Sequence, residues 1–252
     1  MTSIRKEKDI VMKTTEIIKN LLYIPLDIPN PPEGCIDGIE NIPKSMMKWD
    51  EFRNCYLIPI AIDYRKEKQI EWFEPFCERF PVLVKWLKDD VIPVTGFGRT
   101  LIIVTAPGET NSPHIDAAPE TFDDLLNQKF RYVVKGNVSD LEFLTDTNET
   151  IRLPEIDKPF MLNGKWPHQM TNTSSDTKYT VAIGWPWEPS ADDEKYQELI
   201  SRSYEKFSSD YLSNEHINLP YNWETMFEDY DANKATHNDA REHAQIVEDM
   251  TA

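Results

Sequence analysis

The stretch RTLIIVTAPGETNSPHID, residues 99–116, combines two patterns that together favour a β fold. Its first half is an apolar, β-branched run of strand length that ends at a Pro-Gly pair, which is typical of a turn. Its second half continues as an extended segment with a histidine and an aspartate two residues apart, His114 and Asp116. The stretch therefore predicts a strand, a turn and a second extended segment that carries a polar pair.

Strand-like patterns of the same kind recur along much of the chain. They are NCYLIPIAIDY (54–64), KFRYVVKG (129–136), a hairpin of LEFLTD and TIRL around Asn148, KPFMLNGKWPHQMTN (158–172) and KYTVAIGWPW (178–187). Short strands with turn signals about every ten residues are typical of an antiparallel sandwich or barrel. We therefore expect an α+β protein with a mainly β core.

Helical patterns lie on both sides of the continuous β region between Arg99 and Trp187. The sequence predicts a short helix over TTEIIKNLL (14–22), followed by an irregular Pro-rich passage from Ile24 to Lys44. From Ile70 onward four aromatic residues recur at helical spacing, which favours a core-facing helix, and Pro81 is suited to begin a second one. These aromatic residues are Trp72, Phe73, Phe76 and Phe80.

The segment SADDEKYQELISRSYEKF (190–207) predicts an amphipathic helix with Ser190 as its N-cap. Its apolar face consists of Tyr196, Leu199, Ile200 and Phe207. We expect one structural domain made of three parts. These are a helical and extended support region (1–94), the β core (95–189) and an acidic C-terminal helical segment (190–252).

The composition of the chain limits its expected binding partners and its expected cellular compartment. The net charge of −17 argues against nucleic acid and anionic membranes as partners, because both bind basic surfaces. No apolar run has the length of a membrane span or of a signal peptide, so we expect a cytoplasmic protein. Three cysteines without metal-site spacing are expected to be reduced thiols. The oligomeric state is left open.

The pair His114 and Asp116 has two interpretations. In an extended segment, residues two apart point to the same side, so both side chains would project together. Two histidines and one carboxylate form the usual facial site for iron(II), and His168 supplies a second histidine on another strand-like segment. The alternative is a polar surface turn with a solvated His114.

The residues after His168 favour a site. If the chain turns near Ser174, the flanking strands pair with His168 opposite Thr180 and Met170 opposite Lys178, and all four face one side. A buried lysine favours an anionic partner, so we expect a carboxylate ligand at Lys178. The alternative is a lysine that begins its strand at the surface and extends into solvent.

These residues resemble the Fe(II)- and 2-oxoglutarate-dependent oxygenases, whose fold is the double-stranded β-helix, a jelly-roll or cupin-like barrel. The resemblance covers roughly residues 95–187. It implies an enzyme with Fe(II) held by His114, Asp116 and His168 as the catalytic centre. It also implies 2-oxoglutarate as cosubstrate, with its far carboxylate bound by Lys178 and Thr180.

The motifs APGETNSPHID, KFRYVVKG and DKPFMLNGKWPHQMTNTS are similar to the aspartyl/asparaginyl β-hydroxylase branch of this superfamily. That resemblance implies Arg131 as the partner of the carboxylate next to the keto group, and the alternative for Arg131 is a surface position on an edge strand. The branch commonly carries arginine where Lys178 stands, and it often lacks the acidic ligand. Lysine at this place is similar to collagen-type prolyl hydroxylases.

The resemblance implies a hydroxylase of an amino acid, either free or within a peptide or protein, with succinate and carbon dioxide as co-products. Two alternatives remain open. One is a cupin-like metalloenzyme that uses the three ligands without 2-oxoglutarate, and the other is a non-catalytic β-barrel that binds a ligand or partner.

Overall fold

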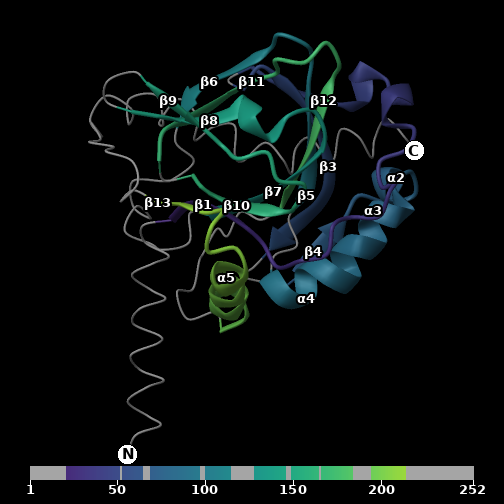
Figure 1. Ribbon diagram of the computed structural model, residues 1–252. Helices are drawn as coiled ribbons and strands as arrows, with labels where there is room; N and C mark the ends of the chain where they lie inside the picture. The colour runs from purple at the N-terminus through teal and green to yellow at the C-terminus, as the bar shows by residue number, and fades with distance from the viewer. Residues whose placement is uncertain are drawn as a thin grey trace, which may run out of the picture.

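The computed structural model describes residues 21–51, 53–64, 69–96, 100–114, 128–145, 149–164, 166–183 and 194–213. Two antiparallel sheets face each other and helices cover the outer side of the larger one (Figure 1). The expectation of an α+β chain with a mainly β core is confirmed. No helix among these residues has the length and apolar character needed to cross a membrane.

The larger sheet has the strand order β13-β1-β10-β7-β12-β5-β3-β2, with β4 paired to β3. Its strands are β1 (Leu21–Pro25), β2 (Lys48–Asp50), β3 (Cys55–Tyr64), β4 (Gln69–Trp72), β5 (Thr100–Thr105), β7 (Gln128–Lys135), β10 (Phe160–Asn163), β12 (Lys178–Ile183) and β13 (Leu212–Ser213). Strands from the first ninety residues thus extend the same sheet as the later strands.

The smaller sheet has the order β6-β11-β8-β9. Its strands are β6 (Thr110–His114), β8 (Leu141–Leu144), β9 (Thr150–Arg152) and β11 (His168–Thr171). The hairpin of β8 and β9 is the one that the sequence predicts. The strand, turn and extended segment expected over 99–116 are β5, a turn at Pro107–Gly108 and β6, with residues 115 and 116 outside the described part.

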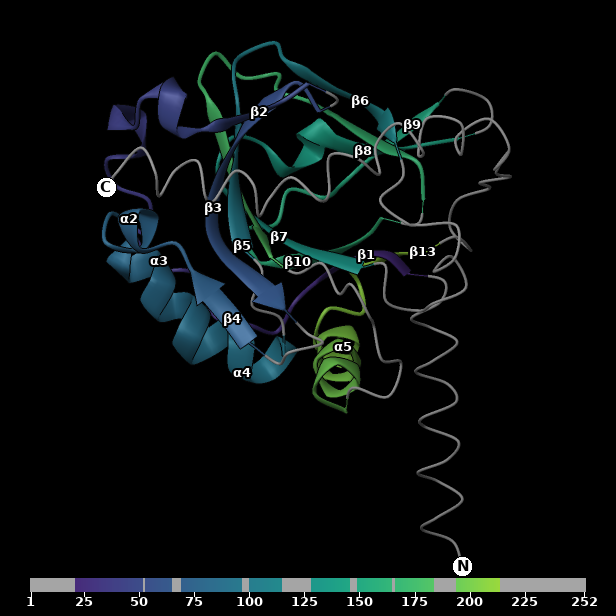
Figure 2. The same ribbon diagram turned by 180° about the vertical axis from the view of Figure 1, so that it is seen from behind.

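The helices are α2 (Glu74–Cys77), α3 (Pro81–Trp86), a π turn (Leu87–Val91), α4 (Ile92–Thr95) and α5 (Glu194–Lys206). Three short 3-10 turns, Ile39–Asn41, Lys44–Met46 and Val138–Asp140, complete the regular structure. Helices α2 to α4 lie along the larger sheet on the side away from the smaller one, as both views show (Figures 1 and 2).

Strict alternation of side chains gives the larger sheet two different faces. In β12, Val181 and Ile183 pack toward the helices in the main hydrophobic core. The neighbouring positions Lys178 and Thr180 face the smaller sheet instead. Because side chains alternate along a strand, one strand serves both the core and the space between the sheets.

Aromatic residues predicted for the core occupy it. Phe73, Phe76 and Phe80 are buried against the larger sheet, and Trp72 is partly buried beside them. Pro81 begins α3, as expected. The predicted helix is nevertheless wrong at its start, because Ile70–Trp72 belongs to β4, where Trp72 pairs with Ala61 of β3.

The expectations for the two ends of the fold are only partly confirmed. The helix predicted over 14–22 is wrong at Leu21 and Leu22, which belong to strand β1, and β1 pairs with β10 and β13. Residues 14–20 lie outside the described part of the chain. Helix α5 confirms the predicted amphipathic helix, with Leu199 and Ile200 buried. The prediction is wrong at its end, because α5 ends at Lys206 and Phe207 is outside the hydrophobic core. Ser190 lies outside the described residues, as does the side chain of Tyr196.

The predicted hairpin between β11 and β12 is wrong. β11 pairs with β6 and β8, whereas β12 pairs with β5 and β7, so the chain crosses from one sheet to the other between them. The buried Asn172 closes the crossing turn. Its amide donates to the carbonyls of Thr105 and Asp176, and its oxygen accepts from Ser174.

The three cysteines are free thiols, as expected. Burial raises the pKa of Cys35 and of Cys77 to about 11. A thiol with a raised pKa is protonated near neutral pH and reacts poorly. This chemistry suits a structural role.

Adjacent residues of α3 test how the helices stabilise the sheet. Leu83 is fully buried, and its neighbour Val82 is exposed. We expect Leu83→Ala to lower the free energy of unfolding by about 2–5 kcal/mol, because it removes buried methyl groups and leaves a cavity. Val82→Ala should change it by about 0.5 kcal/mol or less. Urea unfolding followed by circular dichroism measures both, and equal losses would contradict the described packing.

Candidate active site

A pocket lies between the two sheets, with about 570 Å³ of empty space that is partly open to solvent. The larger sheet contributes Ile103, Arg131, Val133, Phe160, Leu162, Lys178 and Thr180, the smaller sheet contributes Asn111, His114, Leu141, His168 and Met170, and Arg53 comes from a turn. Five of the six residues that the sequence singles out, His114, Arg131, His168, Lys178 and Thr180, therefore line one cavity. The sixth, Asp116, lies outside the described residues.

The two histidines face each other across a strand pair. His114 of β6 is directly opposite His168 of β11, and the ring centroids are 4.4 Å apart. Their exposed fractions are only 6% and 4%, so the alternative of a solvated His114 in a surface turn is wrong. The two imidazoles therefore lie close together in the lining of the pocket.

A register shift places a third polar side chain of β6 in the pocket. Asn111 is opposite Met170, and His114 is opposite His168, so β6 advances three residues where β11 advances two. Because of such a bulge, two residues that are an odd number of positions apart in a strand can face the same side. Bulges of this kind often occur beside active sites. It accounts for Asn111 and His114 lining the same cavity.

The tautomer of His168 follows from its hydrogen bond. Its Nδ1 lies 2.9 Å from the carbonyl oxygen of Trp166. A carbonyl accepts only, so Nδ1 carries a proton and donates, and in the neutral form of the ring the lone pair lies on Nε2. A backbone acceptor on the far ring nitrogen is the usual arrangement behind a metal-ligating histidine.

Two histidine side chains in the pocket are potential metal ligands. Within the described ranges, no three His, Cys, Asp or Glu side chains form a group that would hold a metal. The two imidazoles His114 and His168 are two nitrogen ligands suited to iron or zinc. A third protein ligand would have to come from elsewhere in the chain, and Asp116 is the residue that the sequence predicts.

Lys178 is buried and forms an ion pair with another residue of the protein. Its Nζ lies 3.0 Å from Asp140 Oδ2, and it also donates to the carbonyl oxygen of Asn137. The two charged side chains are 2% and 1% exposed, so the alternative of a lysine extending into solvent is wrong. The carboxylate beside Lys178 belongs to the 3-10 turn before β8, whereas the sequence predicts a bound carboxylate ligand at this place.

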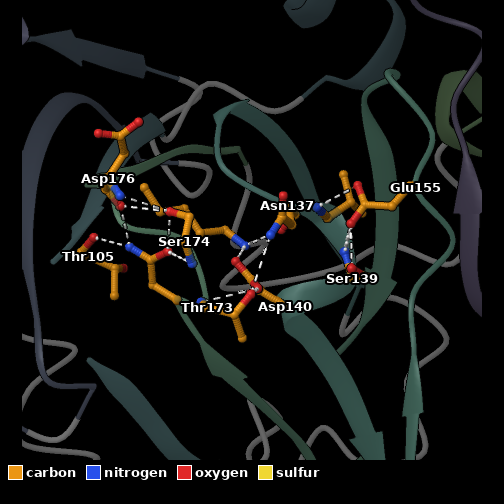
Figure 3. A network of polar contacts seen from close by, with 11 residues as sticks. Thr105, Asn137, Ser139, Asp140, Glu155, Thr173, Ser174 and Asp176 are labelled. Atoms are coloured by element: carbon orange, nitrogen blue, oxygen red, sulfur yellow. Dashed lines mark hydrogen bonds and ion pairs between the residues drawn. The ribbon is translucent and has the colours of Figure 1, made fainter. Parts of the chain in front are cut away.

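Asp140 is in turn held by hydrogen bonds (Figure 3). Its Oδ1 accepts from the hydroxyl of Thr173 at 2.6 Å and from the Thr173 amide at 3.3 Å. Glu155 accepts from the amides of Val138 and Ser139 at the start of the same turn. The carboxylate of Asp140 therefore has a fixed position.

Burial and charge act in opposite directions on this ion pair. Burial lowers the pKa of Lys178, and the hydrogen bond and charge of Asp140 only partly restore it. For Asp140, burial acts to raise the pKa, but the hydrogen bond from Thr173 and the charge of Lys178 outweigh it and hold the pKa below its ordinary value. Asp140 is therefore ionised near neutral pH and supplies the charge that a buried ammonium needs.

Arg131 occupies an inner strand. β7 lies between β10 and β12, and Arg131 pairs with Phe160 and with Ala182. The alternative of a surface arginine on an edge strand is therefore wrong. Its Nη1 donates to the carbonyl of Phe130 at 3.0 Å, and its side chain lines the pocket.

The strand register places Lys178 and Arg131 at different ends of the pocket. Lys178 pairs with Thr105, where β5 ends, and Arg131 pairs with Ala182, four positions along β12. At about 3.3 Å per residue, this spacing corresponds to about 13 Å. The turns after Thr105 and before Lys178 are joined by backbone hydrogen bonds between 108–109 and Asn172. Lys178 therefore lies at the end that these turns close.

Three further residues of the site, Arg53, Asn111 and Asp140, were not predicted from the sequence. Arg53 belongs to the turn between β2 and β3, where its Nη1 lies 2.8 Å from Asp50. Asn54 of the same turn donates to Glu109 of the β5–β6 turn, which joins this hairpin to the closed end of the pocket. No local pattern marks these residues, because long-range sheet pairing brings them to the pocket.

No protein-family profile matches the chain, and no curated protein is significantly similar to it. Among solved structures, it is similar to an oxidoreductase of the 2OG-Fe(II) oxygenase family from Burkholderia pseudomallei. The identity is 9% over 69% of this chain and 88% of that chain, and the TM-score is 0.43.

It is also similar to a full-length protein of Neurospora crassa in complex with α-KG and 5-formyluracil, with 9% identity over 77% of this chain and 90% of that chain and a TM-score of 0.39. A prolyl-4-hydroxylase of Pseudomonas putida has 10% identity over 69% and 96% of the two chains, with a TM-score of 0.38.

Two glycines test how closely the Lys178 side chain is confined. Both Gly136 and Gly108 have positive φ, so alanine strains the backbone at either position. A Cβ at Gly136 would lie 2.8 Å from Lys178 Cγ, whereas a Cβ at Gly108 meets nothing within 4 Å. We expect Gly136→Ala to lower the unfolding free energy by about 1–3 kcal/mol more than Gly108→Ala, because it overpacks a buried site. Thermal unfolding measures this difference. Equal losses of unfolding free energy in the two variants would show that the Lys178 side chain can move aside without cost.

Proposed function

We propose that this protein is an Fe(II)- and 2-oxoglutarate-dependent dioxygenase that hydroxylates an amino acid, free or within a peptide or protein. The observation that carries the proposal is the buried pair His114 and His168 in one pocket with Lys178, Thr180 and Arg131. In this proposal the two facing sheets are the halves of a double-stranded β-helix.

The residues of the pocket suit the two small molecules. His114, His168 and Asp116 would hold iron(II), and the tautomer of His168 is the one that a metal ligand requires. Asn111 Oδ1 is buried and has no hydrogen-bond partner among the described residues. An orphaned acceptor in a pocket is costly unless a ligand satisfies it, which supports a bound polar molecule.

Each remaining polar residue has a proposed task. Lys178 and Thr180 bind the far carboxylate of 2-oxoglutarate at the closed end of the pocket. Arg131 offers a planar guanidinium that suits the carboxylate next to the keto group. The apolar residues of the lining exclude water. Iron(II), when bound, supplies the redox chemistry by which oxygen and the keto acid yield succinate, carbon dioxide and a hydroxylated product.

The proposal also includes the branch of the superfamily and the cellular compartment. The motifs around His114 and His168 favour the aspartyl/asparaginyl β-hydroxylase-like branch, with a lysine like that of prolyl hydroxylases. The three free thiols support a reducing compartment such as the cytoplasm.

One observation favours a second candidate function. Asp140 already provides a carboxylate for Lys178, so the lysine does not require an anionic ligand to be buried. A cupin-like metalloenzyme that binds its metal through the same residues and uses no 2-oxoglutarate is consistent with this pairing.

Substitution of a proposed iron ligand tests the metal site. We expect the protein to bind iron(II) and, with its prime substrate, to convert 2-oxoglutarate to succinate, and His168→Ala to abolish both. Anaerobic calorimetry with iron(II) and measurement of released succinate are the readouts. His237→Ala is the control, since His237 lies in the polar C-terminal segment, which the sequence analysis does not assign to the site. Unchanged iron binding in His168→Ala would contradict the proposed ligand.

Removal of the ammonium separates the two candidate functions. Lys178→Met alone would leave the Asp140 charge buried without a partner, so it is combined with Asp140→Asn. The loss of one charged hydrogen bond should weaken 2-oxoglutarate binding about 10- to 100-fold and leave iron binding unchanged. Lys85→Met, at an exposed position, is the control. If the unaltered protein binds iron and shows no affinity for 2-oxoglutarate, this result would instead support the cupin-like metalloenzyme.

A further inference from the structure

The buried lysine has fewer donors for a ligand than an isolated ammonium. Of its three N–H groups, one contacts Asp140 and one the carbonyl of Asn137. The third finds no acceptor among the residues that the structure describes, and Lys178 lines the pocket. A single N–H is therefore left for a molecule in the pocket, which Thr180 also lines.

The position of the ammonium is determined from several sides. Asp140 is held by Thr173, and the Asn137 side chain also donates to Thr173 at 3.3 Å. Gly136 lies against the aliphatic stem of Lys178, where a Cβ would come within 3.2 Å of its Cβ and Cδ. These contacts come from the residue that follows β7, from the 3-10 turn and from the β11–β12 crossing, so the lysine is confined before any ligand binds.

Asp140 has two opposing effects on anion binding. Its charge partly cancels that of Lys178, which weakens the attraction for an anion. Without it, a lysine that is 2% exposed would lose its proton or its orientation, because an unpaired buried charge is unfavourable. A neutral amine attracts a carboxylate far less than an ammonium does, so the second effect is the larger one.

We propose that Asp140 is a positioning residue that keeps Lys178 charged and leaves one of its N–H groups available to a carboxylate at the closed end of the pocket. This inference rests on the proposed function, in which that carboxylate is the far one of 2-oxoglutarate. Asp140 does not touch the ligand itself and acts through Lys178.

Two keto acids distinguish positioning from a general structural role. 2-Oxoglutarate and 2-oxobutyrate share the keto acid group, and only the first has a second carboxylate. With iron(II) present and oxygen excluded, calorimetry on the full chain should show that Asp140→Asn weakens 2-oxoglutarate binding about tenfold or more, as expected for loss of a charged hydrogen bond. The affinity for 2-oxobutyrate should change less than about twofold.

Glu142 provides a matched control. It is a mostly buried carboxylate two positions from Asp140, and its partners include Gln169 and Arg152. Glu142→Gln should leave the affinities for both keto acids unchanged. Gly136→Ala is a second test if Asp140→Asn folds poorly, because it displaces the Lys178 stem without removing a charge. It should also weaken 2-oxoglutarate selectively, relative to Gly108→Ala.

The outcomes separate this inference from the function on which it rests. If the unaltered protein binds iron but neither keto acid, the 2-oxoglutarate function and this inference both fail. If it binds 2-oxoglutarate and Asp140→Asn binds it equally well, only the role of Asp140 is overturned. Equal weakening of both keto acids by Asp140→Asn would likewise overturn positioning, since it would indicate a general disturbance of the pocket.

Discussion

A lysine ammonium between two sheets needs a counter-charge, and Asp140 supplies it to Lys178 at 3.0 Å. This ion pair joins β12 of the larger sheet to the turn that leads into β8 of the smaller one. Breaking a buried pair by removing one partner leaves an uncompensated charge, which commonly costs about 3–5 kcal/mol. The closed end of the pocket is therefore constrained electrostatically as well as by packing.

The pocket exists because the larger sheet uses its two faces differently. One face packs on helices α2 to α4 with aromatic and branched side chains, and the other faces the smaller sheet across polar and apolar residues (Figures 1 and 2). The smaller sheet brings the two histidines to this space. A rigid, helix-covered sheet thus supports one wall of the site, and the histidine pair forms part of the other.

The individual strands were largely predictable, because alternation and turn residues are local signals. Strands β3, β5, β7 and β12 occur where the sequence analysis expects them. The partner of each strand was less predictable. The turn around Ser174 has the form of a hairpin in sequence, but the side chain of Asn172 bonds to Thr105 and directs the chain to the other sheet. The aromatic run from Ile70 begins in a strand because β3 offers an edge for pairing.

The residue types of the candidate site, and the parity that sets Lys178 and Thr180 on one face, could be read from the amino-acid sequence, since they depend only on chain order and on the two-residue period of a strand. Three features could be seen only in the folded chain: Asp140 neutralises Lys178, Arg53 and Asn111 reach the pocket, and β11 and β12 belong to different sheets. These features depend on pairing between distant segments, whose energies arise from burial and long-range hydrogen bonds that no local pattern encodes.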